Sequence, residues 1–407
     1  MSDQVLSIIA KTPAEVDILR NMSTQHETVL WQPASARHIK PDTEVHLYIP
    51  KHHVQNVTDL LKTHLLAHRV LLQDTQELIA MQTRNHTSDP RSSETFYERY
   101  HSLEDIYYWI NRTITDNPDR AKVILIGSSY EKRPLYVLKL SGRKSNDAKK
   151  AMWIDCGIHA REWISPAFCL WFVDHCLKYY GENVEVTQLL DTLDLYVLPV
   201  MNPDGYKYTW TTNRMWRKNR SKHPHSDCIG TDLNRNFDAN WCTEGASDYP
   251  CEEIYCGQFP ESEPESRAVA NFLRSHKDTV KLYFSIHSYS QMLLFPYSCS
   301  YEQAQNHDEL LALVQEAAQN IRRYYRNQYK YGAGAKTIYL APGGSDDWAY
   351  KMGIEYSFTF ELQDRGTYGF LLPPSYITKA SKEAALAVKG ITLRVIQKKQ
   401  WASPPQS

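Results

Sequence analysis

The sequence predicts an α/β domain built on a mixed, twisted sheet with helices on both faces, preceded by a small ferredoxin-like α+β domain. Its 407 residues exceed what one hydrophobic core usually serves, so two domains are expected. Continuous apolar runs after about residue 92 are typical of strands buried on both faces of a sheet. The first 75 residues instead follow the order strand, helix, strand, strand, helix, strand.

The first unit, residues 1–75, begins with an apolar strand at residues 4–9. Thr12 is expected to cap a helix that has Pro13 in its first turn and ends near residue 26. The other expected elements are two strands, an amphipathic helix and a last strand, at residues 29–31, 44–49, 53–68 and 69–73. This order is the ferredoxin-like arrangement.

Residues 76–91 are expected to form a connecting helix and a polar junction that contains Pro90, Arg91 and, directly after it, Ser92. Exposed stretches of small polar residues are preferred sites of proteolysis. Trypsin-like proteases cleave after Arg, so cleavage between Arg91 and Ser92 is one interpretation of the junction. A plain linker is the other.

Residues 92–400 carry the larger domain, and residues 401–407 form a tail. Residues 122–126 and 135–140 flank a turn, as the two strands of a hairpin do. Buried strands are expected at residues 151–156, 193–200, 281–286 and 356–362, with helices at 166–180, 263–276, 308–325 and 379–399. Strands that alternate with helices predict a mixed sheet covered on both faces. The polar insertion at residues 298–335 is expected to be weakly anchored.

Composition excludes several classes of partner. The chain is 42% hydrophobic and 23% charged, and its net charge is -1. This balance gives no case for nucleic acid or a membrane surface as a partner, and no apolar run is long enough to span a bilayer. The first ten residues do not resemble a signal peptide, which alone would suggest a cytoplasmic protein.

Two other features favour a secreted protein from which the signal peptide has been removed. Four cysteines crowd into one polar stretch at residues 228–256, which indicates either a metal site or disulfides. No C-x-x-C pair is present, so disulfides and an oxidising compartment are favoured. The chain also has N-x-Ser/Thr glycosylation sequons at Asn21, Asn56, Asn85, Asn111 and Asn219.

Polar residues stand at the ends of three expected buried strands, where α/β sheets build their sites. His159 and Glu162, three residues apart, converge on one point if the segment turns helical, but this motif alone is weak. His287 offers a third ligand, and a catalytic zinc needs three ligands and one open position. Glu361 closes an aromatic-rich strand, where it is either a general base or one half of a structural salt bridge.

These residues, in this order, resemble the zinc metallocarboxypeptidases with A and B specificities. The resemblance covers the whole chain, from the ferredoxin-like activation domain to the final helix. It also rests on NRMWRKN at residues 213–219, DLNRNF at 232–237 and YLAPGGSDDW at 339–348. The resemblance implies one Zn²⁺ per chain, held by the two histidines and Glu162, with Glu361 as general base. It further implies an activation domain that inhibits by covering the site, since that domain has no Cys to ligate zinc.

The resemblance assigns roles to other residues of the site. Arg217 would stabilise the oxyanion, and Tyr339 would close over the substrate on a Gly-rich segment that can move. Asp232 would orient His159. The residues that would bind substrate, the first two through its terminal carboxylate, are Asn234, Arg235, Arg161 and Tyr289.

Specificity is assigned to Asp346, which the resemblance places at the base of the pocket for the terminal side chain. A buried carboxylate is costly unless a cation meets it, so Asp346 implies substrates that end in Lys or Arg. The neighbouring Asp347 is expected to be structural.

The family pattern implies three disulfides, Cys156–Cys169, Cys228–Cys251 and Cys242–Cys256. Cys176 and Cys299 are left over. Cys176 is expected to be a buried thiol, and Cys299, in a more polar stretch, to be exposed and reactive.

Three functions remain open. The first is a secreted plasma-type zymogen, activated after Arg91 by a trypsin-like protease such as thrombin or plasmin, that releases C-terminal Lys or Arg and down-regulates fibrinolysis by removing C-terminal Lys from fibrin. The second is a digestive, pancreatic-type B zymogen. The third is an inactive, carboxypeptidase-like binding domain. Sequons in the activation segment and the Pro90–Arg91 junction favour the plasma-type zymogen. The complete set of zinc ligands and general base disfavours the inactive binding domain.

Overall fold

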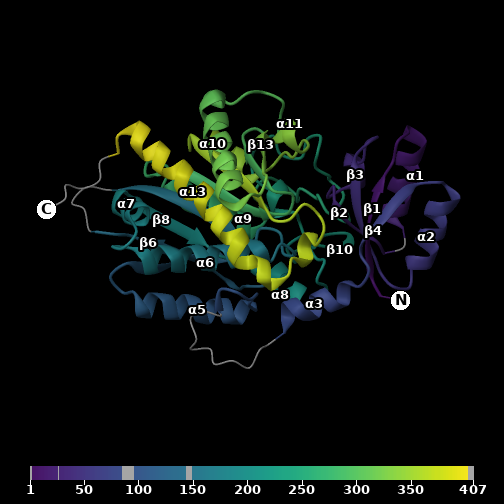
Figure 1. Cartoon of the computed structure of the whole chain (residues 1–407), viewed down its shortest axis with the longest axis horizontal. Helices are drawn as coiled ribbons and strands as arrows, with labels where there is room; N and C mark the ends of the chain where they lie inside the picture. Colours follow the sequence, from purple (N-terminus) through teal and green to yellow (C-terminus); the bar gives the residue numbers. More distant parts are fainter. Residues whose placement is uncertain (1, 26, 85–95, 144–148, 402–407) are drawn as a thin grey trace.

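The computed structural model of the protein describes residues 2–25, 27–84, 96–143 and 149–401. Figure 1 shows a small N-terminal unit, in purple, packed against one side of a larger unit. The predicted cleavage site, Arg91 and Ser92, and the sequon residue Asn85 lie outside the described residues. In the described part of the chain, no helix is long and apolar enough to cross a bilayer. The boundaries drawn at residues 75 and 91 stay predictions.

The N-terminal unit has the predicted ferredoxin-like order. Its antiparallel sheet has the strand order β2-β3-β1-β4. Thr12 Oγ1 accepts a hydrogen bond from the backbone N–H of Glu15 and so caps the first helix, in which Pro13 occupies the first turn. The elements are β1 (Gln4–Ile9), α1 (Pro13–Thr24), β2 (Val29–Gln32), β3 (Glu44–Ile49), α2 (Val54–Thr63) and β4 (Ala67–Leu72), with the short 3₁₀ turn η1 (Ala36–His38) after β2.

The second helix of this unit is shorter than predicted. The sequence pattern places it at residues 53–68, but α2 ends at Thr63 and β4 already begins at Ala67. Leu65 has a left-handed backbone with φ of 53° and is 89% exposed. A left-handed residue ends a helix, and the apolar side chain of Leu65 therefore does not continue the buried stripe.

The larger unit contains an eight-stranded mixed sheet in the order β13-β12-β14-β11-β7-β8-β6-β5. The central strands β14, β11, β7 and β8 are parallel, whereas β12 on one side and β6 and β5 on the other run antiparallel to their inner neighbours. The strands are β5 (Ala121–Ser128), β6 (Pro134–Leu140), β7 (Lys150–Cys156), β8 (Leu193–Leu198), β11 (Val280–Ser288), β12 (Met292–Phe295), β13 (Lys330–Ala333) and β14 (Tyr356–Leu362), with a separate ribbon of β9 (Lys222–His223) and β10 (Ser226–Ile229).

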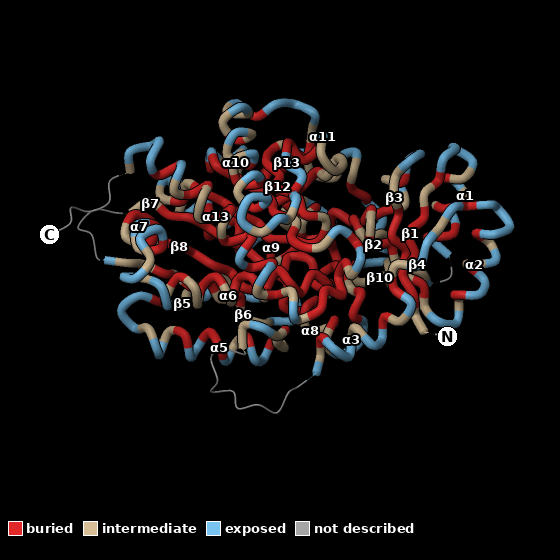
Figure 2. The backbone as a smooth tube through the Cα atoms, viewed as in Figure 1, coloured by how far each residue is buried: buried red, intermediate tan, exposed pale blue. Residues whose placement is uncertain are grey.

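Helices cover both faces of this sheet, as predicted. Alternate residues of β7 divide between the two cores: Met152 and Ile154 pack on one face, Ala151 and Trp153 on the other. Figure 2 shows the sheet as a buried layer within the larger unit. The helices are α3 (Thr75–Thr83), α5 (Leu103–Asp116), α6 (Ile164–Tyr179), α7 (Val184–Thr192), α8 (Pro203–Thr211), α9 (Pro264–Ser275), α10 (His307–Tyr325), α11 (Gly334–Thr337), α12 (Ser345–Lys351) and α13 (Ile377–Lys399), with 3₁₀ turns η2 (Leu233–Arg235), η3 (Gly369–Leu371) and η4 (Pro374–Tyr376).

The insertion at residues 298–335 is better anchored than the sequence suggested. Its main element, α10, packs against α13 and buries Leu310, Val314 and Ile321 in the main core. Its end, β13, pairs with β12. The expected lack of apolar anchoring is therefore corrected for α10, since its apolar residues at helical spacing fix one face. That the segment is a labile flap whose loss inactivates the mature enzyme stays a prediction.

One apolar cluster joins the two units. Val5, Trp31 and Leu72 of the N-terminal unit pack with Met215, Tyr289, Phe370 and Leu371 of the larger one. At the surface, Arg37 forms an ion pair of 2.7 Å with Glu252. The contact surface therefore has an aromatic centre and a charged edge.

Candidate metal centre and substrate pocket

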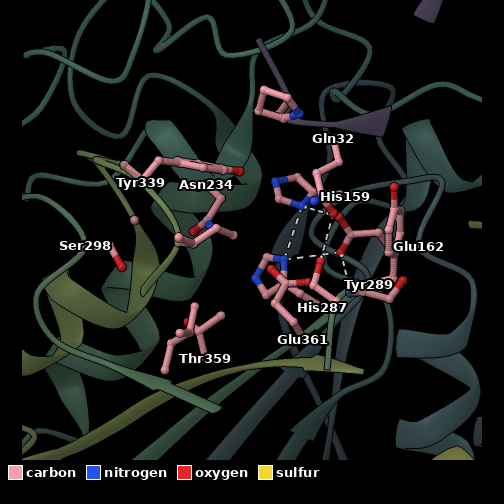
Figure 3. A pocket seen from close by; sticks show the side chains of 18 of the residues that line it. Gln32, His159, Glu162, Asn234, His287, Tyr289, Ser298, Tyr339, Thr359 and Glu361 are labelled. Atoms are coloured by element: carbon pink, nitrogen blue, oxygen red, sulfur yellow. Dashed lines mark hydrogen bonds and ion pairs between the residues drawn. The ribbon is translucent and has the colours of Figure 1, made fainter. Parts of the chain in front are cut away.

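His159, Glu162 and His287 converge on one point at the carboxyl ends of β7 and β11 (Figure 3). The Nδ1 atom of His159 lies 2.7 Å from Glu162 Oε1 and 3.2 Å from His287 Nδ1. His287 Nδ1 lies 3.2 Å from Glu162 Oε2. All three side chains are buried. The predicted ligand set is thus assembled in the structure.

This triad fits a zinc ion. Ligand atoms about 2.0–2.1 Å from a tetrahedral zinc lie roughly 3.3 Å apart. The two separations that involve His287, both 3.2 Å, match this value, whereas that between His159 and Glu162, 2.7 Å, is shorter. The two Nδ1 atoms face each other, and neutral imidazole nitrogens that both lack a proton can share a cation but not a hydrogen bond. The donor set of two imidazoles and one carboxylate is that of catalytic zinc sites.

Asp232 holds two residues of the site in place. Its Oδ1 atom lies 3.1 Å from His159 Nε2, which leaves His159 Nδ1 for the metal. Its Oδ2 atom accepts hydrogen bonds from Nη2 and Nε of Arg217, at 2.9 and 3.2 Å. Burial tends to raise the pKa of Asp232, but Arg217 and His159 outweigh it and hold the pKa well below its usual range. Asp232 is therefore a permanent anion behind the metal ligands.

Glu361 stands beside the triad on β14, directly opposite His287 in the parallel register with β11. Burial raises the pKa of Glu361 to about 8, with the charge of His287 opposing and that of Glu162 adding to the effect. Its side chain lines the same cavity as the triad. A carboxyl group there can exchange a proton with a water molecule near the metal.

Arg235 and Asn234 lie on η2, on the opposite wall of the cavity. The side chain of Arg235 donates to the carbonyl oxygens of Gly245 and Asn234, at 3.2 and 2.9 Å. Gly343 packs so closely that a Cβ atom there would lie 2.2 Å from the carbonyl oxygen of Arg235. Its backbone also bonds to Phe237 and Ala239 on both sides. The glycine at position 343 is therefore required for close packing.

Asp346 and Asp347 are adjacent but have different surroundings. Asp347 accepts hydrogen bonds from the backbone N–H groups of Ser298 and Cys299, at 2.9 and 2.6 Å. Asp346 lines the cavity, and its Oδ2 atom is buried without a hydrogen-bond partner in the described part of the chain. Burial raises the pKa of Asp346, opposed by a hydrogen bond from Thr359. The structural position expected for Asp347 agrees with its contacts.

The N-terminal unit covers this cavity, which measures about 80 Å³. Trp31, Gln32, Pro33 and Ala34 line it together with the triad. The expectation that the activation domain covers the site is thus confirmed.

Two histidines of the N-terminal unit stack on two tyrosines of the site. The ring of His38 lies on Tyr339, with centroids 4.5 Å apart. The Nδ1 atom of His46 lies 2.7 Å from the hydroxyl oxygen of Tyr289, and the two rings stack. Both tyrosines were predicted to contact substrate, and both are occupied here by the N-terminal unit.

Arg161 is placed apart from the cavity. It is fully buried, its guanidinium lies 4.4 Å from the centroid of the Phe370 ring, and it donates a long hydrogen bond to the carbonyl of Met215. Burial lowers its pKa to about 10. While the N-terminal unit is docked, Arg161 is buried and cannot make its predicted contact with substrate.

Sequence reasoning missed the support behind His287. Ser285 Oγ lies 3.1 Å from His287 Nε2 and donates to Asp155 Oδ1 at 2.7 Å. The signal was present, because Asp155 is a charge within the apolar run of β7, the same anomaly that identified Glu361. Thr359 was missed because a Thr within a strand is ordinary.

The three predicted disulfides are formed: Cys156–Cys169, Cys228–Cys251 and Cys242–Cys256. Cys176 is a buried thiol, as expected. The prediction of an exposed, reactive Cys299 is wrong. Cys299 is 5% exposed, and burial together with the charge of Asp347 raises its pKa, which disfavours the reactive thiolate.

The sequons fall into two groups. Asn21, Asn56 and Asn111 are exposed. Asn219 is fully buried, and its amide donates to Glu263 Oε2 at 2.7 Å, so a glycan has no access to it in the folded chain. Its prediction as a glycosylation site is therefore corrected.

Comparison with protein families decides the classification. Residues 106–387 match the zinc carboxypeptidase family, and residues 6–82 match the carboxypeptidase activation peptide. The chain belongs to the zinc carboxypeptidase family. It is thus a zinc-dependent carboxypeptidase that acts on peptides and carries an activation peptide.

Relatives in this family match over nearly the full length. Carboxypeptidase B2 of Bos taurus is 52% identical over 396 residues, which cover 97% of this chain and 93% of the relative. Carboxypeptidase B of Rattus norvegicus is 47% identical over 376 residues, covering 92% and 89%. The crystal structure of thrombin activatable fibrinolysis inhibitor superposes with a TM-score of 0.95 at 52% identity, covering 98% of this chain and 100% of that one.

Proposed function

We propose that the chain is the secreted zymogen of a B-type exopeptidase that releases C-terminal Lys or Arg. The observation that carries this proposal is the carboxylate of Asp346, buried at the cavity wall with one oxygen unpaired. An uncompensated buried anion is unfavourable, and a substrate ammonium or guanidinium group would compensate it.

The proposed roles follow from position. A zinc ion in the triad supplies, when bound, a Lewis acid that polarises a carbonyl and acidifies water. Glu361 takes up a proton at its carboxylate and returns it to the leaving amine. Arg217, fixed by Asp232, donates to the oxygen on which negative charge develops. Each group is held by the fold before substrate arrives.

Exopeptidase specificity is assigned to η2. Arg235 and Asn234 would bind the terminal carboxylate of the substrate through charge-assisted hydrogen bonds. An internal peptide bond offers no carboxylate at this point. Tyr339 would cover the bound residue once His38 no longer stacks on it. Arg161 and Tyr289 would then contact the preceding substrate residues.

Two observations support an extracellular enzyme. Three disulfides suit an oxidising compartment. Two exposed sequons, Asn21 and Asn56, lie on the activation peptide. Activation by a trypsin-like protease such as thrombin or plasmin is proposed at Arg91. The similarity to thrombin activatable fibrinolysis inhibitor supports a role in down-regulating fibrinolysis by removing C-terminal Lys from fibrin.

The test is hydrolysis of two matched peptides, one ending in Arg and one in Phe, before and after cleavage by thrombin. We expect activity on the Arg peptide that appears only after cleavage at Arg91 and disappears with a zinc chelator. Preference for Phe would overturn the assignment of Asp346. Inactivity on both peptides, with zinc bound, would favour a binding domain.

A second assay separates the fibrinolytic role from the digestive alternative. Plasmin-treated fibrin is incubated with the activated enzyme, and released lysine is measured. Release of lysine at a rate comparable to that from a small Lys peptide supports the fibrinolytic role. Cleavage of small peptides without lysine release from fibrin would favour the digestive alternative.

A further inference from the structure

A second group of metal-ligating side chains lies on the N-terminal unit. In the described part of the chain, two groups of three such side chains bring their ligand atoms within 4.8 Å of one another. The first consists of the zinc ligands His159, Glu162 and His287. The second consists of Glu27, His52 and His53. Figure 1 places α1 and α2, which flank these residues, on the side of the unit that faces away from the catalytic sheet.

The geometry of this second group suits an ion. Glu27 Oε2 lies 3.3 Å from His52 Nε2. The rings of His52 and His53 are 4.3 Å apart between centroids and are tilted by 56°, so they do not stack, and the ligand atoms of all three residues lie within 4.8 Å of one another. Two imidazoles and one carboxylate form the donor set that zinc, nickel and copper prefer. Glu27 and His52 are exposed, so an ion can reach them from solvent.

The backbone holds both ligand segments in place. Glu27 has a left-handed backbone with φ of 52°, which few residues other than glycine adopt. The adjacent Thr28 hydroxyl lies within hydrogen-bond distance of the carbonyl oxygens of Met22 and Gln25, at 3.3 and 3.2 Å, and fixes this turn. The backbone N–H of His53 donates to the carbonyl of Pro50 at 2.9 Å. The backbone segments that carry the ligands are therefore ordered before an ion binds.

We propose that Glu27, His52 and His53 bind one divalent transition-metal ion of the zinc class, with a fourth position open to water. The ion would tie the turn after α1 to the start of α2. Glu27 lies just before β2, and β2 carries Trp31 into the cluster that joins the two units. A metal at this site would therefore brace the strand that covers the catalytic cavity.

The experiment titrates Zn²⁺ into the intact zymogen that already holds its catalytic zinc. Equilibrium dialysis measures the ions bound per chain, and thermal unfolding measures the gain in Tm. We expect one additional ion per chain and a higher Tm. His52→Ala and Glu27→Gln should each weaken this binding at least about tenfold, because even the loss of an outer partner costs 10–100-fold. His64→Ala, which removes an exposed histidine at the end of α2, should bind like the wild type.

Unchanged binding in His52→Ala and Glu27→Gln would overturn the proposal, as would an equal loss in His64→Ala. Binding of only the catalytic ion would overturn it too. Each variant is also cleaved and assayed on an Arg peptide, so that a misfolded chain is recognised by its lost activity.

Discussion

The two walls of the catalytic cavity differ in how their buried carboxylates are paired. The metal wall carries the zinc ligands and Glu361, and the pocket wall carries Asp346. On the metal wall the buried carboxylate of Asp232 binds both Arg217 and His159. On the pocket wall the Oδ2 atom of Asp346 has none in the described part of the chain. Asp232 is thus paired within the fold before substrate arrives, whereas Asp346 keeps one oxygen that a substrate cation would pair. This difference supports the proposal that specificity rests on a buried carboxylate that the substrate cation must pair.

The largest effect is expected on the metal wall. Glu361→Gln keeps the shape of the side chain but removes its proton chemistry, so kcat on an Arg peptide should fall by about 10²–10⁴-fold. Steady-state kinetics of the cleaved enzyme measure this, and zinc content should stay at one per chain. A loss below about threefold with zinc in place would contradict the role of Glu361 as general base.

The pocket wall should show a change of preference. Asp346→Ser removes the unpaired carboxylate, so kcat/KM for the Arg peptide should fall by about two to three orders of magnitude, the cost of leaving a buried cation unpaired. The Phe peptide should improve at the same time. Both peptides are compared on the same enzyme preparation. If both peptides lose activity equally, Asp346 supports the fold and does not select the substrate.

Asp347 provides the matched control for Asp346. Asp347→Asn weakens the hydrogen bonds to the backbone of Ser298 and Cys299, so the free energy of unfolding should fall by about 1–3 kcal/mol. The ratio of Arg to Phe hydrolysis should stay as in the wild type. Chemical denaturation and the two peptides test this. A lost Arg preference without lost stability would remove the distinction between the two carboxylates.

The smallest effect concerns His38 of the N-terminal unit, which covers both walls of the cavity. Burial, assisted by the charge of Arg235, lowers the pKa of His38 to about 3, against about 6.5 for a free histidine. Below pH 6.5, His38 takes up a proton when the activation domain is released but stays neutral while the domain is docked. Docking therefore weakens as pH falls from about 6.5 towards 3 and is unaffected above 6.5.

Activity of the intact zymogen, relative to the cleaved enzyme, should accordingly rise up to about tenfold between pH 7.5 and 5.5. The variant His38→Phe keeps a ring over Tyr339 and cannot take up a proton there, so its rise should be smaller. An identical rise in both proteins would show that His38 does not control docking.

The sequence predicted the parts of the site that lie on strands. His287 and Glu361 could be found because strand ends and misplaced charges are visible in a pattern of apolar runs. The roles of Arg217 and Arg235 came only from family resemblance, because both lie in irregular segments whose course depends on tertiary contacts.

Other features could not be read from local pattern at all. The sequon at Asn219 looks like any other, yet its side chain is buried against Glu263. Leu65 continues an apolar period, but its left-handed backbone ends the helix. Cys299 stands between two serines and is nevertheless buried. For Asn219 and Cys299 burial is decided by segments distant in sequence, and for Leu65 by a backbone conformation that apolar periodicity does not show.

The cluster of Trp31, Tyr289 and Phe370 has a consequence for the activation step. While the chain is intact, the covalent connection holds the activation domain at its own cavity at a high effective concentration. Cutting the tether leaves only non-covalent contacts to retain the domain, among them this aromatic patch, the contacts of His38 with Tyr339 and of His46 with Tyr289, and the exposed Arg37–Glu252 pair. The freed domain then behaves as an ordinary dissociable inhibitor, and its occupancy follows the total protein concentration. The same cleaved enzyme would accordingly be partly latent in a concentrated solution and fully active after dilution.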